Sequence, residues 1–401
     1  MLTCATVIGG KLNGLGVCRS LARGGVVSYV VDRSRWQAGM WSRHARPVLT
    51  RDLEGAPLID CLLQLQATLK QRPFLVITDE MAVLTVSEHR EILASKFLFR
   101  LPPHDTVLML YDKGRFHEFA IAAGLPVPNA AIVGRTSELG KIRALRFPVI
   151  MKPIDKRNFH AGVAPRLAIA HNIGQAIEAG EELLQTSGKL IVQERVDGPD
   201  DSIYFCLFYR GRGATTVAMF TGRKLASIPP GTGSTAFCTA AAPEACHVLE
   251  TLTRDLLKRI DYSGFGSVEY KWDPRERRFV IIEPTVGRTD WQEEGATLSG
   301  VNIPLEAYRH ELGLSPERTD SRVQRNVWRG SFFNRLMLGS DFIPPDASVY
   351  DGYWRFDDPL PAIVHYPLDA CCLAGSRLAC WARSSIGDTQ HLPRWLRHKA
   401  H

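Results

Sequence analysis

Several common signatures are missing from this sequence of 401 residues. It contains nine cysteines, an odd number, and none of them forms a Cys-x-x-Cys pair, so neither a disulfide framework nor a zinc site is indicated. No uninterrupted apolar run approaches the roughly 20 residues that a bilayer span needs. The amino end also lacks a basic segment followed by an apolar core and a cleavage site. We therefore expect a cytoplasmic protein without a membrane span.

No block of consecutive Lys and Arg residues is present either, although the formal net charge is +7. A diffuse positive charge favours anionic partners such as phosphates, nucleotides or acidic lipid surfaces, and it gives no argument for nucleic acid. The apolar content of 45% and the charged content of 23% are ordinary for a soluble globular protein. The length predicts two or three domains with a sizeable core.

The amino end predicts a β-α-β unit and hence a parallel α/β sheet. A buried strand over residues 3–8 is followed by a glycine-rich turn, a helix to about Arg23 and a second strand over residues 26–31. The turn contains Gly14-Leu15-Gly16, but the third glycine of the dinucleotide fingerprint is absent and no Gly-Lys-Ser/Thr ending follows. A tight strand-to-helix turn is therefore the simpler interpretation of these glycines.

The middle of the chain alternates between predicted strands and helices. Polar or glycine-bearing loops are expected at residues 156–162 and around Arg223-Lys224 with residues 230–234. Apolar periodicity, caps and breakers predict strands over 74–78, 147–153, 190–194 and 203–209, and helices ending near 97 and 124 and spanning 173–184 and 245–260.

Residues 264–288 predict a β-hairpin that carries two acidic residues. Val268, Tyr270 and Trp272 alternate on one face, and Asp273-Pro274 opens the turn. Folding the hairpin can bring Glu269 and Glu283 to one end of a sheet, because antiparallel neighbours lie about 5 Å apart. Two adjacent carboxylates suit Mg²⁺ together with substrate phosphates. A solvated hairpin whose acids pair with Arg275, Arg277 or Arg278 is the alternative.

Four ordered motifs together resemble the ATP-grasp superfamily, most closely its carboxylate–amine ligases, over roughly residues 1–315. They are Asp112-Lys113 before a helix that ends in Gly-Leu-Pro-Val-Pro, Pro148 to Lys152-Pro153, the strand Val192-Gln193-Glu194, and the hairpin. The resemblance implies an α/β (α+β) fold. A Rossmann-like pre-ATP-grasp domain (1–110) would precede a two-subdomain ATP-grasp domain (111–315, with its lid at about 148–195) and a C-terminal extension (316–401) of unknown role.

The resemblance also implies a site for ATP and Mg²⁺, with Mn²⁺ as an alternative metal. Lys113 and Lys152 resemble the lysines that contact the phosphates. The other nucleotide-binding candidates are Gln193 and Glu194 at the adenine hinge, Asp201 at the ribose (with Asp200 competing for that role), and His160 and Gly162 in the flap over the phosphates.

The metal candidates by the same resemblance are Glu269, Glu283 and Thr285. Thr285 stands where the family usually has the asparagine of Glu-x-Asn, and a threonine hydroxyl ligates a hard cation more weakly than an amide carbonyl does. Arg288, which lies one residue later than the usual arginine, and Lys224 are the catalytic candidates. Arg288 would stabilise the oxyanion of a tetrahedral intermediate.

The function implied is ATP-dependent joining of a small-molecule carboxylate to an amine through an acylphosphate, with release of ADP and phosphate. Phosphoryl or carbamoyl transfer in the same fold, or nucleotide binding without catalysis, are the alternatives. No nucleic-acid partner is expected, and a homodimer is one option for the assembly. Aromatic residues interleaved with arginines in the tail, from Trp328 to Trp395, are interpreted as packing against the main body rather than as a nucleic-acid or membrane surface.

Overall fold

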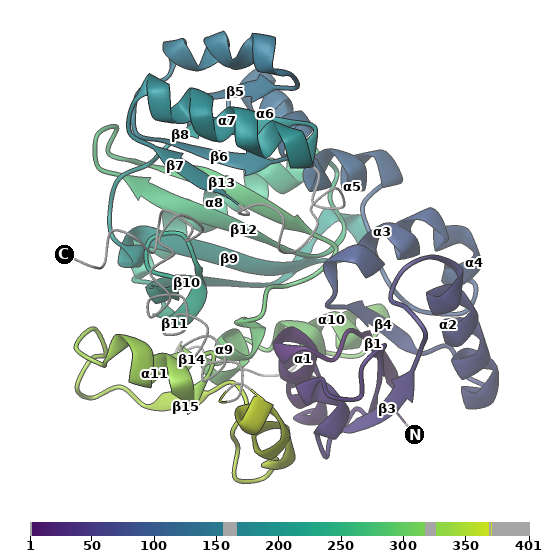
Figure 1. Ribbon diagram of the computed structural model, residues 1–401. Helices are drawn as coiled ribbons and strands as arrows, with labels where there is room; N and C mark the ends of the chain where they lie inside the picture. The colour runs from purple at the N-terminus through teal and green to yellow at the C-terminus, as the bar shows by residue number, and fades with distance from the viewer. Residues whose placement is uncertain (1, 155–166, 317–325, 369, 371–401) are drawn as a thin grey trace, which may run out of the picture.

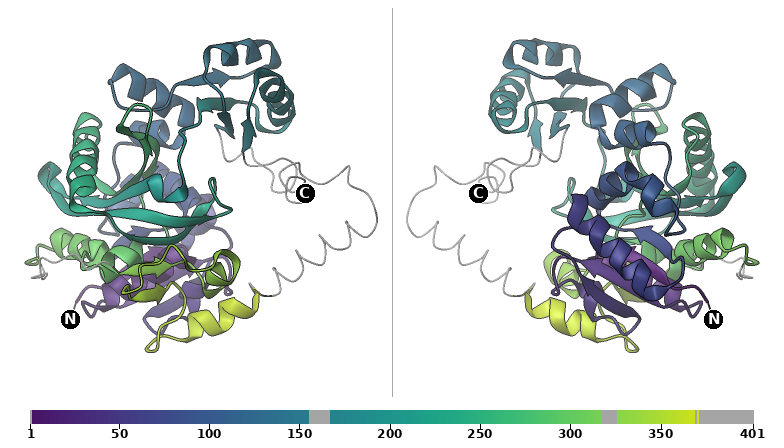
Figure 2. Two further views of the ribbon diagram at one scale, coloured as in Figure 1. Left: turned by 90° about the vertical axis from the view of Figure 1, so that its left-hand side faces the viewer. Right: turned by 90° about the vertical axis from the view of Figure 1, so that its right-hand side faces the viewer.

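The computed structural model describes residues 2–154, 167–316, 326–368 and 370. Three sheets organise the chain: a parallel sheet near the N-terminus, a long central sheet, and a small antiparallel sheet at the far end of the molecule from the first (Figures 1 and 2). The expected flap, with Arg157, Asn158, His160 and Gly162, and the tail beyond residue 370 lie outside the described residues.

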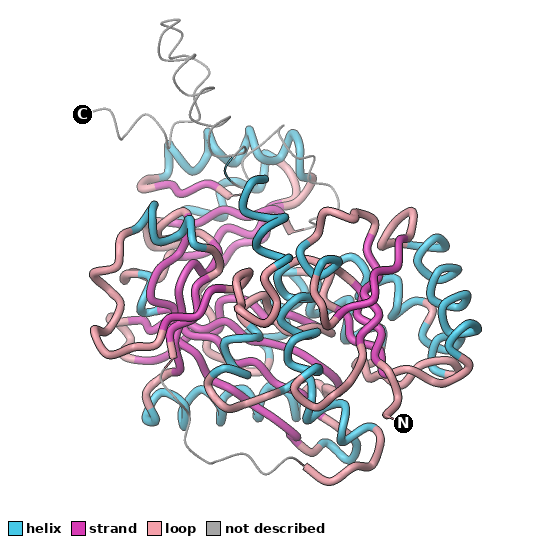
Figure 3. Tube along the Cα trace, turned by 90° about the horizontal axis from the view of Figure 1, so that it is seen from below, coloured by secondary structure: helices cyan, strands magenta, loops and turns pink. Residues whose placement is uncertain are grey.

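The N-terminal sheet confirms the predicted parallel α/β opening. Its strand order is β3-β2-β1-β4, all parallel, and it forms a group of strands separate from the central sheet when seen from below (Figure 3). At the end of β1, Gly9 adopts a φ of 100°, and a Cβ on Gly14 would lie 1.9 Å from the Gly9 carbonyl oxygen. Close packing of the start of α1 on the end of β1 therefore accounts for Gly9 and Gly14. The expected turn is too long, because α1 begins at Leu12 and contains both Gly14 and Gly16. The elements are β1 Ala5–Ile8, α1 Leu12–Ala22, β2 Ser28–Asp32, β3 Ala45–Leu49, α2 Gly55–Leu69, β4 Phe74–Ile77, α3 Glu80–Glu88 and α4 Arg90–Ala94.

The central sheet has seven strands in the order β13-β12-β9-β10-β11-β14-β15. The expected loop around Arg223-Lys224 is wrong, because both residues lie inside β10, and the turn follows at residues 229–233. Pairing with β9 on one side and β11 on the other fixes this strand. The elements are β9 Ile203–Arg210, β10 Thr216–Ile228, β11 Ser234–Ala240, α8 Pro243–Arg259, β12 Gly264–Asp273, β13 Arg278–Val286, α9 Glu293–Leu298 and α10 Ile303–Glu311.

The small antiparallel sheet has the order β5-β8-β6-β7 and packs one face on α7. Val149, Met151 and Val192 belong to the apolar cluster on that face, so the alternate residues Ile150, Lys152, Ile191 and Gln193 lie on the opposite face. Strand β8 spans the predicted residues 190–194. The elements are α5 His104–Tyr111, α6 Lys113–Ala122, β5 Ala130–Val133, β6 Val149–Pro153, β7 Ala168–Ala170, α7 Ile173–Ser187 and β8 Leu190–Glu194.

Part of the C-terminal extension completes the central sheet. Strand β14 (Val327–Arg329) pairs with β11, and β15 (Val349–Asp351) pairs with β14, while α11 spans Phe332–Leu338. Trp328 is buried in the core, as expected for the tail aromatics, whereas Phe356 is 94% exposed. None of the helices in the described part of the chain is long and apolar enough to cross a membrane.

Buried charges join this extension to the N-terminal domain. The Arg19 Nε atom of α1 lies 2.9 Å from Asp358 Oδ2, and its Nη1 atom lies 3.6 Å from Glu294 Oε2 on α9. Arg355 Nη2 approaches Glu294 Oε1 at 2.9 Å. Two arginines and two carboxylates therefore neutralise one another where α1, α9 and the extension meet.

Candidate active site

The two hairpin carboxylates face each other across the strands. Glu269 on β12 is directly opposite Glu283 on β13 in the register, and Ser267 is directly opposite Thr285. Residues two apart on a strand share a face, so these four oxygen-bearing side chains lie on one face of the hairpin. Opposed like charges are destabilising unless cations neutralise them.

Two lysines supply that neutralisation. Lys113 Nζ donates to Glu283 Oε1 at 2.7 Å, and Lys224 Nζ lies 2.7 Å from Glu269 Oε2. Lys113 is the first residue of α6, which Asp112 caps by accepting hydrogen bonds from the backbone NH groups of Gly114 and Arg115. The Lys224 side chain is 5% exposed; burial disfavours its ammonium, but the Glu269 carboxylate outweighs burial and raises the pKa of Lys224. The alternative, in which the hairpin acids pair with Arg275, Arg277 or Arg278, is therefore wrong for Glu269 and Glu283, which pair with lysines.

A cavity brings Lys113 and Lys152 together with Glu283. Lys152 and Gln193 enter it from the face of the small sheet that is turned away from α7. The apolar part of its wall consists of Leu110, Phe116, Val127, Ile191, Ile281 and Ile282. A pocket with apolar walls and a few convergent polar groups is the usual form of a cofactor site. Two distant lysines and a hairpin acid thus converge on one space.

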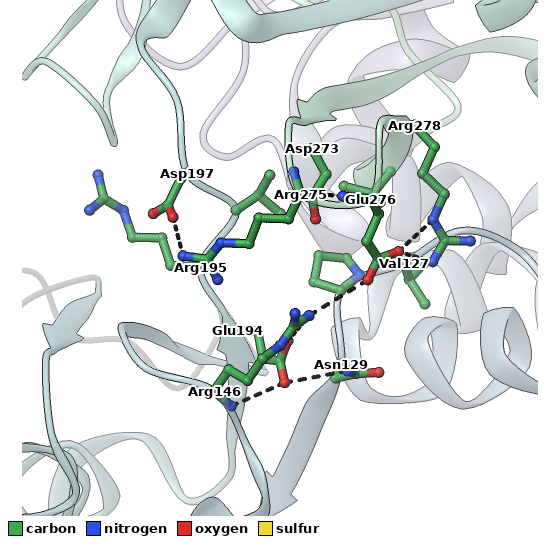
Figure 4. Close-up of a pocket in the computed structure, with 13 residues that line it drawn as sticks. Val127, Asn129, Arg146, Glu194, Arg195, Asp197, Asp273, Arg275, Glu276 and Arg278 are labelled. Carbon is green, nitrogen blue, oxygen red and sulfur yellow. Dashed lines mark hydrogen bonds and ion pairs between the residues drawn. The ribbon is translucent and has the colours of Figure 1, made fainter.

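Glu194 lies in a different cavity (Figure 4), which shares the lining residue Val127 with the first. Its side chain lies on the same face of β8 as that of Val192. Its carboxylate accepts hydrogen bonds from Arg146 Nε at 2.8 Å and from Asn129 Nδ2 at 3.3 Å. Burial would raise the pKa of Glu194, but the bonds from Arg146 and Asn129 prevail and lower it. Gln193, rather than Glu194, is the polar residue of this strand that lines the cavity of the two lysines.

The acids expected near a ribose have partners of their own. Asp201 Oδ2 lies 2.8 Å from Arg223 Nη2. Asp200 accepts hydrogen bonds from the backbone NH groups of Ser227 and Gly231, both at 2.8 Å. Asp200 therefore fixes the start of the turn after β10, whereas Asp201 is held by one partly exposed arginine.

Arg288 lies just after the hairpin, where the chain approaches the start of α3. Its Nη1 atom is 3.1 Å from Asp290 Oδ1, and its Nη2 atom is 4.0 Å from Glu80 Oε2 at the start of α3. Burial disfavours the guanidinium, but Asp290 and Glu80 together raise its pKa. Asn13 of α1 donates to the Thr289 carbonyl oxygen at 2.7 Å, which joins the glycine turn to the same segment. Arg288 therefore stays charged between the end of the hairpin and α3.

One polar residue of the lysine cavity was not found from the sequence. His117 lies four residues after Lys113 on α6 and lines the same cavity. The spacing of four residues from Lys113 could have predicted this, because residues i and i+4 lie on the same face of a helix.

No family model matches the sequence. A D-aspartate ligase of Enterococcus faecium is 23% identical over 236 residues, which are 54% of this chain and 53% of the relative. The chain thus spans about half the length of that curated relative.

Solved structures cover more of the chain. The N5-carboxyaminoimidazole ribonucleotide synthetase of Thermus thermophilus has a TM-score of 0.61 and 18% identity, over 80% of this chain and 82% of its own. The Staphylococcus aureus N5-carboxyaminoimidazole synthetase complexed with ADP has a TM-score of 0.62 and 15% identity, over 82% of both chains. The biotin carboxylase domain of a Hydrogenobacter thermophilus 2-oxoglutarate carboxylase was solved in complex with MgADP and bicarbonate. It has a TM-score of 0.61 and 15% identity, over 82% of this chain and 74% of its own. The chain has the ATP-grasp fold.

The donor set of this ATP-grasp fold fits a hard divalent cation. Glu269 and Glu283 offer carboxylate oxygens, and Ser267 and Thr285 offer hydroxyl oxygens on the same hairpin face. Oxygen ligands of this kind, completed by phosphate, are what Mg²⁺ uses in nucleotide sites. In the described part of the chain, no group of three or more His, Cys, Asp and Glu side chains forms a metal site on its own. A cation here would thus depend on nucleotide phosphates for part of its shell.

Proposed function

We propose that the protein is an ATP-dependent ligase that joins a small-molecule carboxylate to an amine through an acylphosphate. The observation that carries the proposal is the convergence of Lys113, Lys152 and Glu283 on one cavity. Glu269, which pairs with Lys224, lies directly opposite Glu283. Cationic groups that suit a triphosphate and carboxylates that suit its metal thus lie close together, which supports the proposal. The ATP-grasp fold supports the same conclusion.

The reaction has a simple physical logic. A carboxylate does not react with an amine at neutral pH, because its oxygen is a very poor leaving group. A carboxylate oxygen attacks the γ-phosphorus of ATP, and ADP leaves. The amine nitrogen then attacks the acyl carbon, phosphate leaves, and the nitrogen loses a proton. The first step needs positioning and charge neutralisation more than covalent help from the protein.

The residues divide this work between the two steps. Lys113 and Lys152 hold the phosphates, and Gln193 contacts the nucleotide at the hinge. Glu269 and Glu283, with weaker help from Thr285, hold Mg²⁺ (Mn²⁺ being an alternative), which supplies neutralisation of phosphate charge when bound. Lys224 extends the positive charge toward the transferring phosphoryl group.

Arg288 belongs to the second step in this proposal. Its charged guanidinium lies between the end of the hairpin and α3, where it can stabilise the oxyanion that forms when the amine attacks. Glu194 and Asp201 remain candidates for adenine and ribose contacts only if the nucleotide displaces Arg146 and Arg223 from them. His160 and Gly162 remain candidates for the flap that excludes water from the acylphosphate.

The names of the similar proteins suggest which substrates to test first. D-Aspartate is named by the curated relative, and bicarbonate is bound in one structural neighbour. We propose a small acid of this kind and a small amine as the substrate pair, with a homodimer as the assembly to test. The biotin carboxylase domain named above was solved as a dimer.

The test is ADP formation with pairs of acids and amines. Purified protein with ATP and Mg²⁺ is given amino acids, D-aspartate among them, with and without small amines. The proposal predicts ADP and phosphate release that requires both an acid and an amine. Release with the acid alone would favour phosphoryl transfer. ADP binding without any release would favour a non-catalytic protein, for which the threonine at position 285 already gives a reason.

A further inference from the structure

His117 carries a buried polar atom that has no partner. Its side chain is 8% exposed, and its Nδ1 atom has no hydrogen-bond partner among the described residues. Burying a polar atom without a hydrogen bond is costly, and such exceptions in native structures have causes. A bound ligand would supply the hydrogen-bond partner that Nδ1 lacks.

The place of His117 in the structure distinguishes it from other residues that carry such an atom. Ser28 Oγ and Trp328 Nε1 are also buried without a partner among the described residues, but neither residue lines the cavity of the two lysines or the cavity of Glu194. His117 lines the cavity of Lys113, Lys152 and Gln193. On α6 it lies one turn beyond Lys113, which corresponds to about 6 Å along the helix axis.

The electrostatic state of His117 limits what it can bind. Burial lowers the pKa of the imidazole against a small opposing effect of Glu118. The cavity also presents Lys113, Lys152 and Glu283 to the ring. A neutral imidazole gives one donor and one acceptor nitrogen, so it forms hydrogen bonds without adding charge. This suits the uncharged nucleoside part of a nucleotide better than it suits the phosphates.

The geometry points to His117 as a nucleotide-binding residue that hydrogen-bonds the nucleoside part of ATP through Nδ1, one helical turn from the lysine that holds the phosphates. This inference rests on the proposed function, because it takes the cavity to be the ATP site. It adds a specificity contact to that site, since a hydrogen bond from a fixed neutral group selects the ligand by shape and polarity.

The experiment measures ADP and tripolyphosphate binding by calorimetry for H117L, H117N and H117Q. In H117L, ADP affinity should fall roughly tenfold, about 1.4 kcal/mol, while tripolyphosphate affinity stays unchanged. H117N, whose amide occupies the place of Nδ1, should restore most of the ADP affinity. H117Q, whose amide reaches the place of Nε2, should not. E118Q, on the exposed neighbouring position, is the matched control and should bind ADP like wild type.

Thermal unfolding without nucleotide separates this role from a structural one. H117L removes an unsatisfied buried atom, so its Tm should equal or exceed that of wild type. A lower Tm with unchanged ADP affinity would overturn the inference and make His117 a core residue. An equal loss of ADP and tripolyphosphate affinity would also overturn it, because His117 would then serve the phosphates. If wild type binds no ADP, the proposed function fails instead.

Discussion

Replacing Glu293 with glutamine is predicted to remove a pH-dependent part of the stability. Glu293 lies on α9, fully buried against α1, where Ser20 Oγ donates to its carboxylate at 3.2 Å and Thr297 Oγ1 donates at 3.1 Å. Burial, with a further contribution from Glu294, raises the pKa of Glu293 to about 8 against the effect of these hydrogen bonds. The side chain is therefore mostly an uncharged acid at neutral pH.

The magnitude follows from the difference between the folded and unfolded pKa values. The pKa of Glu293 rises from an ordinary value of 4.5 to about 8. Each unit of this difference corresponds to about 1.4 kcal/mol. Because the folded state binds the proton more tightly, the stabilisation is fully present below pH 4.5. It declines as the pH rises and is lost at about pH 8. The change across this window is therefore on the order of several kcal/mol.

The assay is urea unfolding of wild type and E293Q from pH 5 to pH 8.5. Glutamine does not titrate, so the free energy of unfolding of wild type should fall relative to E293Q as the pH rises. E294Q is the contrasting control, because it leaves Arg19 and Arg355 without their shared carboxylate. It should lower the free energy of unfolding at every pH in the series. Parallel curves for wild type and E293Q would refute the reasoning.

Three further predictions concern the site and the domain junction. K152A should weaken ADP binding at least tenfold by calorimetry with an unchanged Tm, and an unaltered affinity would remove Lys152 from the nucleotide site. E283Q should abolish amine-dependent ADP formation while the far-ultraviolet circular dichroism stays the same; retained turnover would contradict the metal assignment. R19M should lower the free energy of unfolding by about 3–5 kcal/mol, because Asp358 and Glu294 would be left buried without it. Denaturant unfolding measures that loss, and a change below 1 kcal/mol would argue against a role for this network.

Local sequence signals were sufficient for much of the fold. The β-α-β opening, the strand 190–194 and the hairpin with its turn after Asp273 were all predicted from apolar periodicity and turn residues. The resemblance to ATP-grasp proteins is confirmed at the level of the fold. Each of these features depends on residues close together in the chain.

The missed features depend on contacts between distant residues. The loop predicted at Arg223-Lys224 is wrong. A lysine inside a buried strand is costly, and the distant Glu269 compensates for the burial of Lys224. Strands β14 and β15 have three residues each, too few for a periodic pattern; β14 exists through pairing with β11, and β15 through pairing with β14. Alternation puts Gln193 and Glu194 on opposite faces of β8, but only the packing of α7 decides which face turns toward the lysines.

The central claim, an acylphosphate intermediate, is tested most directly by isotope transfer. An acid that stimulates ADP formation in the screen is prepared with ¹⁸O in its carboxylate and turned over with ATP and the amine. The account predicts that one carboxylate oxygen appears in the released phosphate for each ADP formed, as read by mass spectrometry. Phosphate that contains no ¹⁸O, although ADP and the joined product both form, would contradict it.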